Sequence, residues 1–191
     1  MSDRPDLPDR LDRERCVLVV VDLQERFRDL IHGFGGVLDA AVRLVRFSQQ
    51  LQIPILVSEQ YPRGLGVTVQ EIRGLLRSFA PLEKLHFSCG LDDGFRKALA
   101  ATGRDQVLLC GIETHVCVYQ TAFDLRRDGH QVALAADAVS SCRATDRALG
   151  LDRMRELGVQ VMGAQMIMFE VVARAGTPEF KQVAPLLRTA D

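Results

Sequence analysis

The sequence has no excess of charge of either sign and no long hydrophobic run. Lys and Arg number 24 and Asp and Glu number 25 in 191 residues. A net charge near −1 gives no electrostatic reason to expect nucleic acid or an anionic membrane as a partner. The apolar run CVLVVV at 16–21 is much shorter than the roughly 20 residues that a membrane-spanning helix needs. We therefore expect neither a nucleic-acid nor a membrane partner.

The cysteines show neither a CxxC pair nor regular spacing. There are five of them, an odd number: Cys16, Cys89, Cys110, Cys117 and Cys142. This pattern argues against a disulfide framework and against structural zinc. The first fifteen residues are charged and lack the apolar segment of a secretory signal. Both observations favour a reducing, cytoplasmic location.

The chain also lacks internal repeats, low-complexity segments and any linker that would divide it. At this length one domain with a sizeable core is expected, and we assign it to residues 15–191. Residues 1–14 are interpreted as a charged N-terminal arm. Such arms are usually solvated and mobile, although a docked arm remains an alternative.

What the sequence does contain is a regular alternation of two patterns. Short β-rich runs lie at 16–22, 53–59, 82–87, 106–111, 131–137 and 159–163, and amphipathic stretches lie near 36–51, 91–102, 115–128 and 145–157. The alternation predicts an α/β fold, a doubly wound parallel sheet with right-handed crossovers and helices on both faces. Gly103, Gly129 and Gly158 stand where helices should end.

Two further segments have weaker signals. Residues 59–81 begin with turn formers and polar groups, so a loop is expected at the carboxyl end of the second strand, the edge where such sheets bind ligands. A last helix should begin near residue 178, with Thr177 as its N-cap and Pro178 in its first position.

The stretch LLCGIETHVCV at 108–118 places two cysteines in different settings. Cys110 lies within an apolar strand and is interpreted as a core residue, as is Cys16. Cys117 follows the strand, and with Thr114 as N-cap it falls in the first turn of a helix. There the free N–H groups and the helix dipole favour a thiolate. Cys117 is therefore either a catalytic or a structural thiol. Cys89 and Cys142 are candidates only for supporting roles in the pocket.

Two charged residues stand at strand ends. Asp22 closes the first run, where a carboxylate is costly unless it is paired or faces a cavity. It is therefore either a functional residue or the N-cap of the helix that follows. Lys84 lies among apolar residues of the third run, where a lysine also marks a sheet edge. His86 shares a strand face with Lys84, but no histidine has a clear claim to be the base. Asp22, Lys84 and Cys117 would form a charge-coupled set if the strand ends converge.

These residues resemble a known family. VLVVVDLQERF, EKLHFSC and LLCGIETHVCV together are similar to the isochorismatase-like cysteine hydrolases, and SEQYPRGLG and DAVSSC resemble the isochorismatase-domain-containing branch. The likeness runs from about residue 16 to 187. It implies a catalytic triad of Asp22, Lys84 and Cys117, and a six-stranded sheet of order 3-2-1-4-5-6.

The resemblance also implies a reaction. A cis peptide at Ile112–Glu113 would turn the N–H of Glu113 toward that of Cys117 as an oxyanion hole, and the thiol would attack a C–N or related acyl bond of a small molecule through a thioester. Nicotinamidases of this superfamily carry an Asp-x-His metal motif after the second strand, whereas VSEQYPRG has neither residue. We therefore expect no metal, no cofactor and no nicotinamidase activity.

Several expectations rest on position or resemblance alone. The substrate pocket is assigned to Phe27, Glu59, Tyr61, Arg63 and His86. A homo-oligomer, a dimer or larger, is expected because the superfamily often forms oligomers. The apolar segment VMGAQMIMFEVV at 161–172 is a candidate interface, with buried core as the alternative. Competing functions are a non-catalytic interaction protein that keeps the pocket, an isochorismatase-type ether hydrolase and a thiol redox protein.

Overall fold

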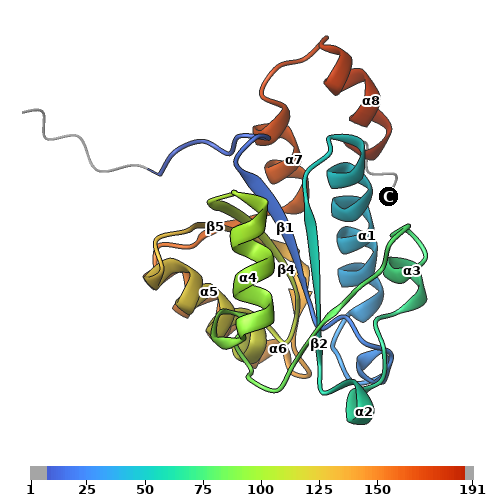
Figure 1. The fold of residues 1–191 in the computed structure, drawn as a ribbon, viewed down its shortest axis with the longest axis vertical. Coiled ribbons are helices and arrows are strands. Elements are labelled where there is room, and N and C mark those ends of the chain that lie inside the picture. The colour runs from blue at the N-terminus through green and yellow to red at the C-terminus, as the bar shows by residue number, and fades with distance from the viewer. Residues whose placement is uncertain (1–7, 188–191) are drawn as a thin grey trace, which may run out of the picture.

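A computed structural model describes residues 8–187, which form a six-stranded sheet covered by helices on both faces (Figure 1). Every neighbouring pair of strands is parallel, and the strand order is β3-β2-β1-β4-β5-β6. The predicted fold and strand order are therefore confirmed. The strands are β1 (Cys16–Val21), β2 (Ile55–Gln60), β3 (Leu82–Lys84), β4 (Gln106–Ile112), β5 (Gln131–Ser140) and β6 (Gln160–Met162).

The longer helices form two layers. One layer holds α1 (Phe34–Gln50), α7 (Ala164–Val172) and α8 (Pro178–Leu187), and the other holds α4 (Asp93–Thr102), α5 (Tyr119–Arg127) and α6 (Ala144–Glu156) (Figure 1). Along β1, Leu18 and Val20 face the first layer, while Val19 and Val21 face the second. Because β1 is buried on both faces, its sequence is apolar throughout, as the fold requires.

The helix ends largely follow the sequence signals. The backbone N–H of Phe180 donates to Oγ1 of Thr177, so the predicted N-cap of α8 is confirmed. Gly103, Gly129 and Gly158 all have positive φ angles and follow helix ends. A left-handed backbone is where glycine is favoured.

Other elements differ from the predictions. The predicted loop 59–81 contains two four-residue helices, α2 (Pro62–Leu65) and α3 (Gln70–Arg73), and β3 ends at Lys84 rather than at residue 87. Helix α7 was not predicted, because its apolar residues do not show a clear amphipathic pattern. Its Ile167 and Met168 are buried in the core, whereas Met166 and Phe169 are exposed.

The predicted mobile arm is wrong for the part that the structure describes. Leu11 is only 4% exposed and belongs to the core on the α1 side of the sheet. Its backbone N–H donates to Glu170, and the N–H of Asp12 donates to the Gln106 side chain. Residues 8–14 are therefore docked on the domain, because one leucine among the charges supplies an apolar anchor. Residues 1–7 lie outside the described residues.

Strands β1 and β4 approach closely at Gly111. A Cβ atom built there would lie 2.0 Å from the carbonyl oxygen of Val21, and the φ angle of Gly111 is +121°. The pairing of β4 with β5 shifts register at the same place, between Leu109 and Gly111. Only glycine satisfies both constraints, and this approach brings the carboxyl ends of β1 and β4 together.

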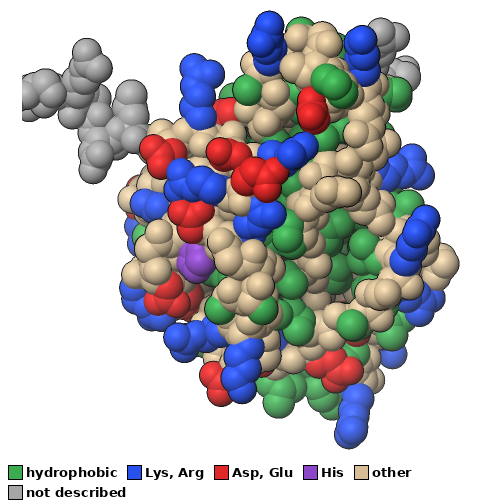
Figure 2. Space-filling view, turned by 45° about the horizontal axis from the view of Figure 1, so that its top comes forward, with side chains coloured by type: hydrophobic (Ala, Val, Ile, Leu, Met, Phe, Trp, Pro, Cys, Tyr) green, Lys and Arg blue, Asp and Glu red, His purple; other side chains and the backbone are tan. Residues whose placement is uncertain are grey.

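The surface shows no dominant charge on the face drawn in Figure 2. Acidic and basic side chains are intermingled there rather than gathered by sign. Among residues 8–187, no helix combines the length and the apolar character that crossing a bilayer requires.

Candidate active site

Three strands bring chemically active side chains to one edge of the sheet. Asp22 directly follows β1, Lys84 is the last residue of β3, and Cys117 lies five residues beyond β4. Strand β1 is paired with β2 on one side and with β4 on the other, so this edge is the topological switch point of the sheet. In open α/β sheets that position is the usual place for a ligand crevice.

Lys84 and Asp22 form a buried ion pair. Nζ of Lys84 lies 2.7 Å from Oδ2 of Asp22, and each side chain is only 1% exposed. Nζ also donates to Oε1 of Gln60 at 2.7 Å and to the backbone oxygens of His86 and Phe87. An ammonium has three protons, so these four acceptors leave it no unused hydrogen-bonding capacity. Lys84 is therefore held as a fixed cation.

The pKa of Lys84 reflects these neighbours. Burial by itself lowers the pKa of a lysine, but the charge and the hydrogen bond of Asp22 act in the opposite direction, and the net shift is upward. The ammonium is thus charged throughout the neutral range. Its location in the edge strand β3 does not make it a surface residue.

Both carboxylate oxygens of Asp22 are engaged. Oδ2 accepts from Lys84, and Oδ1 accepts from the hydroxyl of Ser58 at 2.7 Å. The Asp22 backbone has a φ angle of 51°, which is uncommon for a residue with a side chain. Asp22 does not cap the short 3₁₀-helix Glu25–Phe27, whose N-cap is Gln24. Its side chain instead contacts Lys84 and Ser58.

Cys117 lies in a π-helical turn, Thr114–Val118, that leads into α5. The residue is buried, with 7% of its surface exposed. The predicted N-cap is wrong: Glu113 holds that position, and the hydroxyl of Thr114 is buried without a hydrogen-bond partner. Helix α6 packs closely on this turn, since a Cβ atom on Gly150 would lie 3.0 Å from the backbone of His115.

The predicted preference of a helix start for a thiolate is outweighed by burial. Burial raises the pKa of Cys117 well above the ordinary value, and the charge of Asp22 raises it further. Lys84 lowers it only in part. The thiol is therefore protonated at neutral pH, because desolvation outweighs both the helix start and the nearby cation.

Glu113, four residues before Cys117, is fixed by a cis peptide bond and by a hydrogen bond to its side chain. The Ile112–Glu113 peptide bond is cis, and the backbone N–H of Cys142 donates to Oε2 of Glu113 at 2.7 Å. Cys142 itself is exposed, whereas Cys16 and Cys110 are fully buried, as predicted for core residues.

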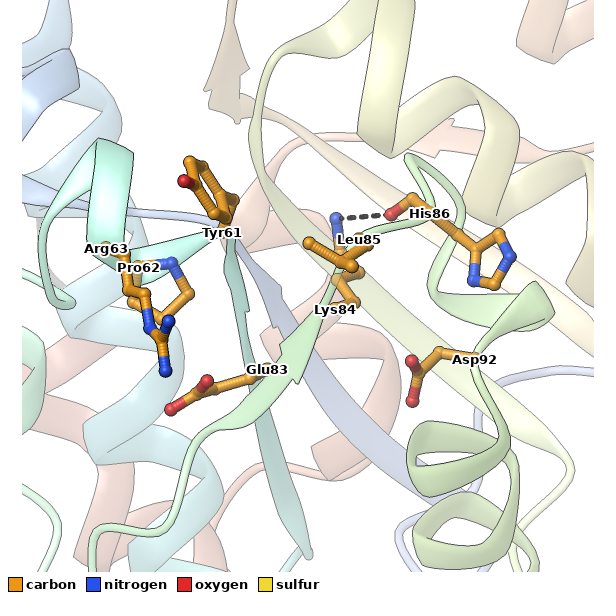
Figure 3. Close-up of a pocket in the computed structure, with 8 residues that line it drawn as sticks. All are labelled: Tyr61, Pro62, Arg63, Glu83, Lys84, Leu85, His86 and Asp92. Atoms are coloured by element: carbon orange, nitrogen blue, oxygen red, sulfur yellow. Dashed lines mark hydrogen bonds between the residues drawn. The ribbon is translucent and has the colours of Figure 1, made fainter.

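A pocket of about 470 Å³ opens beside β3. Tyr61 and Arg63 lie on one side of it, and His86 and Asp92 lie on the other (Figure 3). The imidazole of His86 points away from the ammonium of Lys84, which contacts only its backbone oxygen (Figure 3). Three of the five residues expected at the substrate pocket are thus brought together here.

The other two lie elsewhere. Glu59 is buried, and its carboxylate accepts hydrogen bonds from both the N–H and the hydroxyl of Thr68, each at 2.7 Å. It thereby anchors the segment after α2. Phe27 is partly buried and packs on the hydrophobic core. Neither residue lines the pocket beside β3.

Three polar residues near the ion pair were not predicted from the sequence. Ser58 contacts Asp22, Gln60 contacts Lys84, and the side chain of Gln24 accepts from the N–H of Gln60 and donates to its carbonyl. For Ser58 and Gln60 the available signal was a polar half-strand, Ser-Glu-Gln at 58–60, directly after the apolar residues 55–57. Among residues 8–187, no group of three or more His, Cys, Asp or Glu side chains is arranged to hold a metal ion.

Comparison with known proteins identifies the family. A model of the Isochorismatase domain matches residues 16–166, which include the sheet, the ion pair and the cysteine turn. The chain belongs to the isochorismatase family.

Its relatives within the family are similar over most of the chain. Isochorismatase domain-containing protein 2 of Danio rerio is 38% identical over 179 residues, which are 93% of this chain and 89% of the relative. Isochorismatase domain-containing protein 1 of Salmo salar is 38% identical over 174 residues, but these cover 91% of this chain and only 61% of that longer relative. A structure described as a MAR1 ribonuclease from Caenorhabditis elegans has a TM-score of 0.90 and 34% identity, covering 95% of this chain and 94% of its own.

Proposed function

We propose that this protein is a metal-free cysteine hydrolase that cleaves a C–N or related acyl bond of a small molecule. Cys117 is the nucleophile, Asp22 the general base and acid, and Lys84 the fixed cation. The observation that carries the proposal is the buried Asp22–Lys84 ion pair at the sheet edge where the Cys117 turn follows β4. A carboxylate next to a neutral thiol is the arrangement that general-base activation needs.

The first step is proton transfer from the Cys117 thiol to Asp22. Each Asp22 oxygen accepts one hydrogen bond, so each keeps a second lone pair that can take the proton. The sulfur then attacks the carbonyl carbon, a C–S bond forms, and the carbonyl π electrons move to oxygen. Lys84 keeps its charge and stabilises the thiolate while it exists.

The oxyanion is assigned to the backbone N–H groups of Glu113 and Cys117. One such donor contributes about 3 kcal/mol to the transition state in well-studied hydrolases. Collapse of the intermediate breaks the C–N bond, and Asp22 returns the proton to the leaving amine. A water molecule then gives a proton to Asp22 and attacks the thioester. The C–S bond breaks, the acid is released, and the sulfur takes its proton back from Asp22.

The substrate is expected to enter through the pocket beside β3, where Tyr61, Arg63 and His86 contact solvent. Glu59 and Phe27 are assigned to support this region rather than to touch the substrate. We further propose that the enzyme is cytoplasmic, forms a homo-oligomer and has no nucleic-acid partner.

The proposal is tested with a panel of small amides and esters and intact-protein mass spectrometry. We expect an acyl adduct on Cys117 and turnover that is lost in Cys117→Ala. Cys16→Ala is the matched control, because Cys16 is also a buried thiol but lies at the opposite end of β1. Turnover that survives in Cys117→Ala would rule out the mechanism.

A second candidate comes from the nematode relative described as a ribonuclease. If this chain shares that activity, it will cleave an RNA oligonucleotide, and Asp22→Asn will abolish the cleavage. The intermingled charges in Figure 2 do not favour this candidate on the face shown. The same panel should include a vinyl ether, since an isochorismatase-type activity would convert it.

A further inference from the structure

A hydrogen-bonded chain behind Asp22 extends the site beyond the three proposed catalytic residues. The thiol of Cys89 lies 3.5 Å from the hydroxyl oxygen of Ser58, and that hydroxyl lies 2.7 Å from Oδ1 of Asp22. All three residues are 0 to 1% exposed. Water is therefore not available to replace any of these contacts.

The chain has a defined direction. Ser58 has one hydroxyl proton, and an ionised carboxylate only accepts hydrogen bonds. Burial raises the pKa of the Cys89 thiol to about 11, so the thiol keeps its proton at neutral pH. Cys89 therefore donates to Ser58, and Ser58 donates to Asp22.

Both ends of this hydrogen-bonded series, Ser58 and Cys89, are held by backbone contacts. Ser58 pairs with Val21 in the register of β1 and β2, and its carbonyl accepts the backbone N–H of Asp22. The backbone N–H of Cys89 donates to Oγ1 of Thr121 on α5, the helix that follows the Cys117 turn. The same helix is held close at Gly90, where a Cβ atom would lie 2.7 Å from that of Asp124.

We propose that Ser58 is a positioning residue whose hydroxyl, oriented by Cys89, fixes Oδ1 of Asp22 so that the carboxylate meets the Cys117 thiol. This inference rests on the proposed function, because it assigns Asp22 a proton-transfer role. Ser58 touches no reacting atom and acts only through Asp22. Without it, the carboxylate keeps Lys84 as its single side-chain partner and is free to rotate.

The test uses 4-nitrophenyl acetate as an acyl donor and follows the acylation of Cys117 against pH. In Ser58→Ala we expect the rate at pH 7 to fall about tenfold, the usual effect of losing a hydrogen bond to a charged group. The acidic limb of the profile should also move to higher pH, because the lost hydrogen bond is one that the Ser58 hydroxyl donates to the charged carboxylate. Ser58→Thr, which keeps the hydroxyl, should restore both.

Ser48→Ala is the matched control, since Ser48 is fully buried in α1 and its hydroxyl has no partner. Its profile should stay that of the wild type, whereas a purely structural effect of serine loss would appear in both variants. If Ser58→Ala does not fold, Cys89→Ala replaces it, with a smaller shift in the same direction expected.

The outcomes separate the two claims. If the wild type is not acylated at Cys117, the proposed function fails. If the wild type is acylated and Ser58→Ala, or Cys89→Ala in its place, keeps the wild-type rate and profile, the positioning role of Ser58 is refuted while the proposed function stands.

Discussion

Replacing Lys84 by methionine removes the ammonium and keeps most of the side-chain volume. Asp22 then stays buried, with the hydroxyl of Ser58 as its one remaining side-chain donor. Gln60 also loses the partner of its buried Oε1, whereas the carbonyls of His86 and Phe87 lie in an exposed segment that water can reach. The main destabilising effect is thus the Asp22 carboxylate, which is left buried without a cation.

The expected loss of unfolding free energy is about 4 kcal/mol, because breaking a buried ion pair by removing one partner costs about 3–5 kcal/mol. In an Asp22→Asn background no negative charge is left behind. There the same Lys84→Met change should cost about 2 kcal/mol less, which is the coupling that a double-mutant cycle measures.

The assay is urea unfolding followed by far-ultraviolet circular dichroism, with linear extrapolation to water. Lys97→Met, at an exposed position of α4, is the matched control and should change stability by less than about 0.5 kcal/mol. A loss below about 1 kcal/mol for Lys84→Met, equal in both backgrounds, would refute the description of a dry, coupled pair.

Three further predictions concern the whole domain. Raised thiol pKa values contribute stability below the pKa of an unfolded thiol, about 8.5, that is lost as the pH rises toward the folded values. The thiols concerned are those of Cys16, Cys89, Cys110 and Cys117. Above pH 9 the unfolding free energy should fall by about 1.4 kcal/mol per pH unit for each of them. An unfolding free energy that stays constant to pH 10.5 would contradict their burial. Gly111→Ala should cost more than about 4 kcal/mol or prevent folding, whereas Gly36→Ala, where a Cβ atom meets nothing within 4 Å, should be neutral or stabilising in thermal denaturation. Leu11→Ala should lower the unfolding free energy by about 2–3 kcal/mol in urea unfolding. An unchanged unfolding free energy would indicate that residues 8–14 are a solvated arm after all.

The sheet could be predicted because its central strands are buried on both faces and so have continuous apolar sequences. The same reasoning placed Asp22 and Lys84 at one edge, since parallel strands present their carboxyl ends together. The strand order was predicted only from the family resemblance. Because β2 lies between β1 and β3, the contact of Asp22 with Lys84 also depends on the long lysine side chain that spans this strand.

Ser58 and Gln60 could not be predicted because their roles depend on register. Ser58 reaches Asp22 because β2 pairs it with Val21, and Gln60 reaches Lys84 because β3 pairs those two residues. A shift of one residue would turn each side chain to the opposite face. Sequence patterns fix which face a strand buries, but not which residues become neighbours across strands.

The errors at Cys117 have a different cause. Local preferences favour Thr114 as an N-cap and a thiolate at a helix start, but the turn is π-helical and tightly packed by Gly150. Burial, which no local rule includes, then becomes the largest influence on the pKa of Cys117. The sequence located the nucleophile candidate but not its resting protonation state.

In the proposed mechanism the Asp22 carboxylate acts directly on the Cys117 thiol. The most direct measurement is the pH dependence of Cys117 alkylation by iodoacetamide, followed by peptide mass spectrometry in the wild type and in Asp22→Asn. Because Asp22 raises the pKa of this thiol and Lys84 lowers it, Cys117 should be alkylated faster in the variant at every pH from neutral to mildly alkaline, while hydrolytic turnover is lost. An alkylation rate equal to that of the wild type would show that the two groups are not coupled.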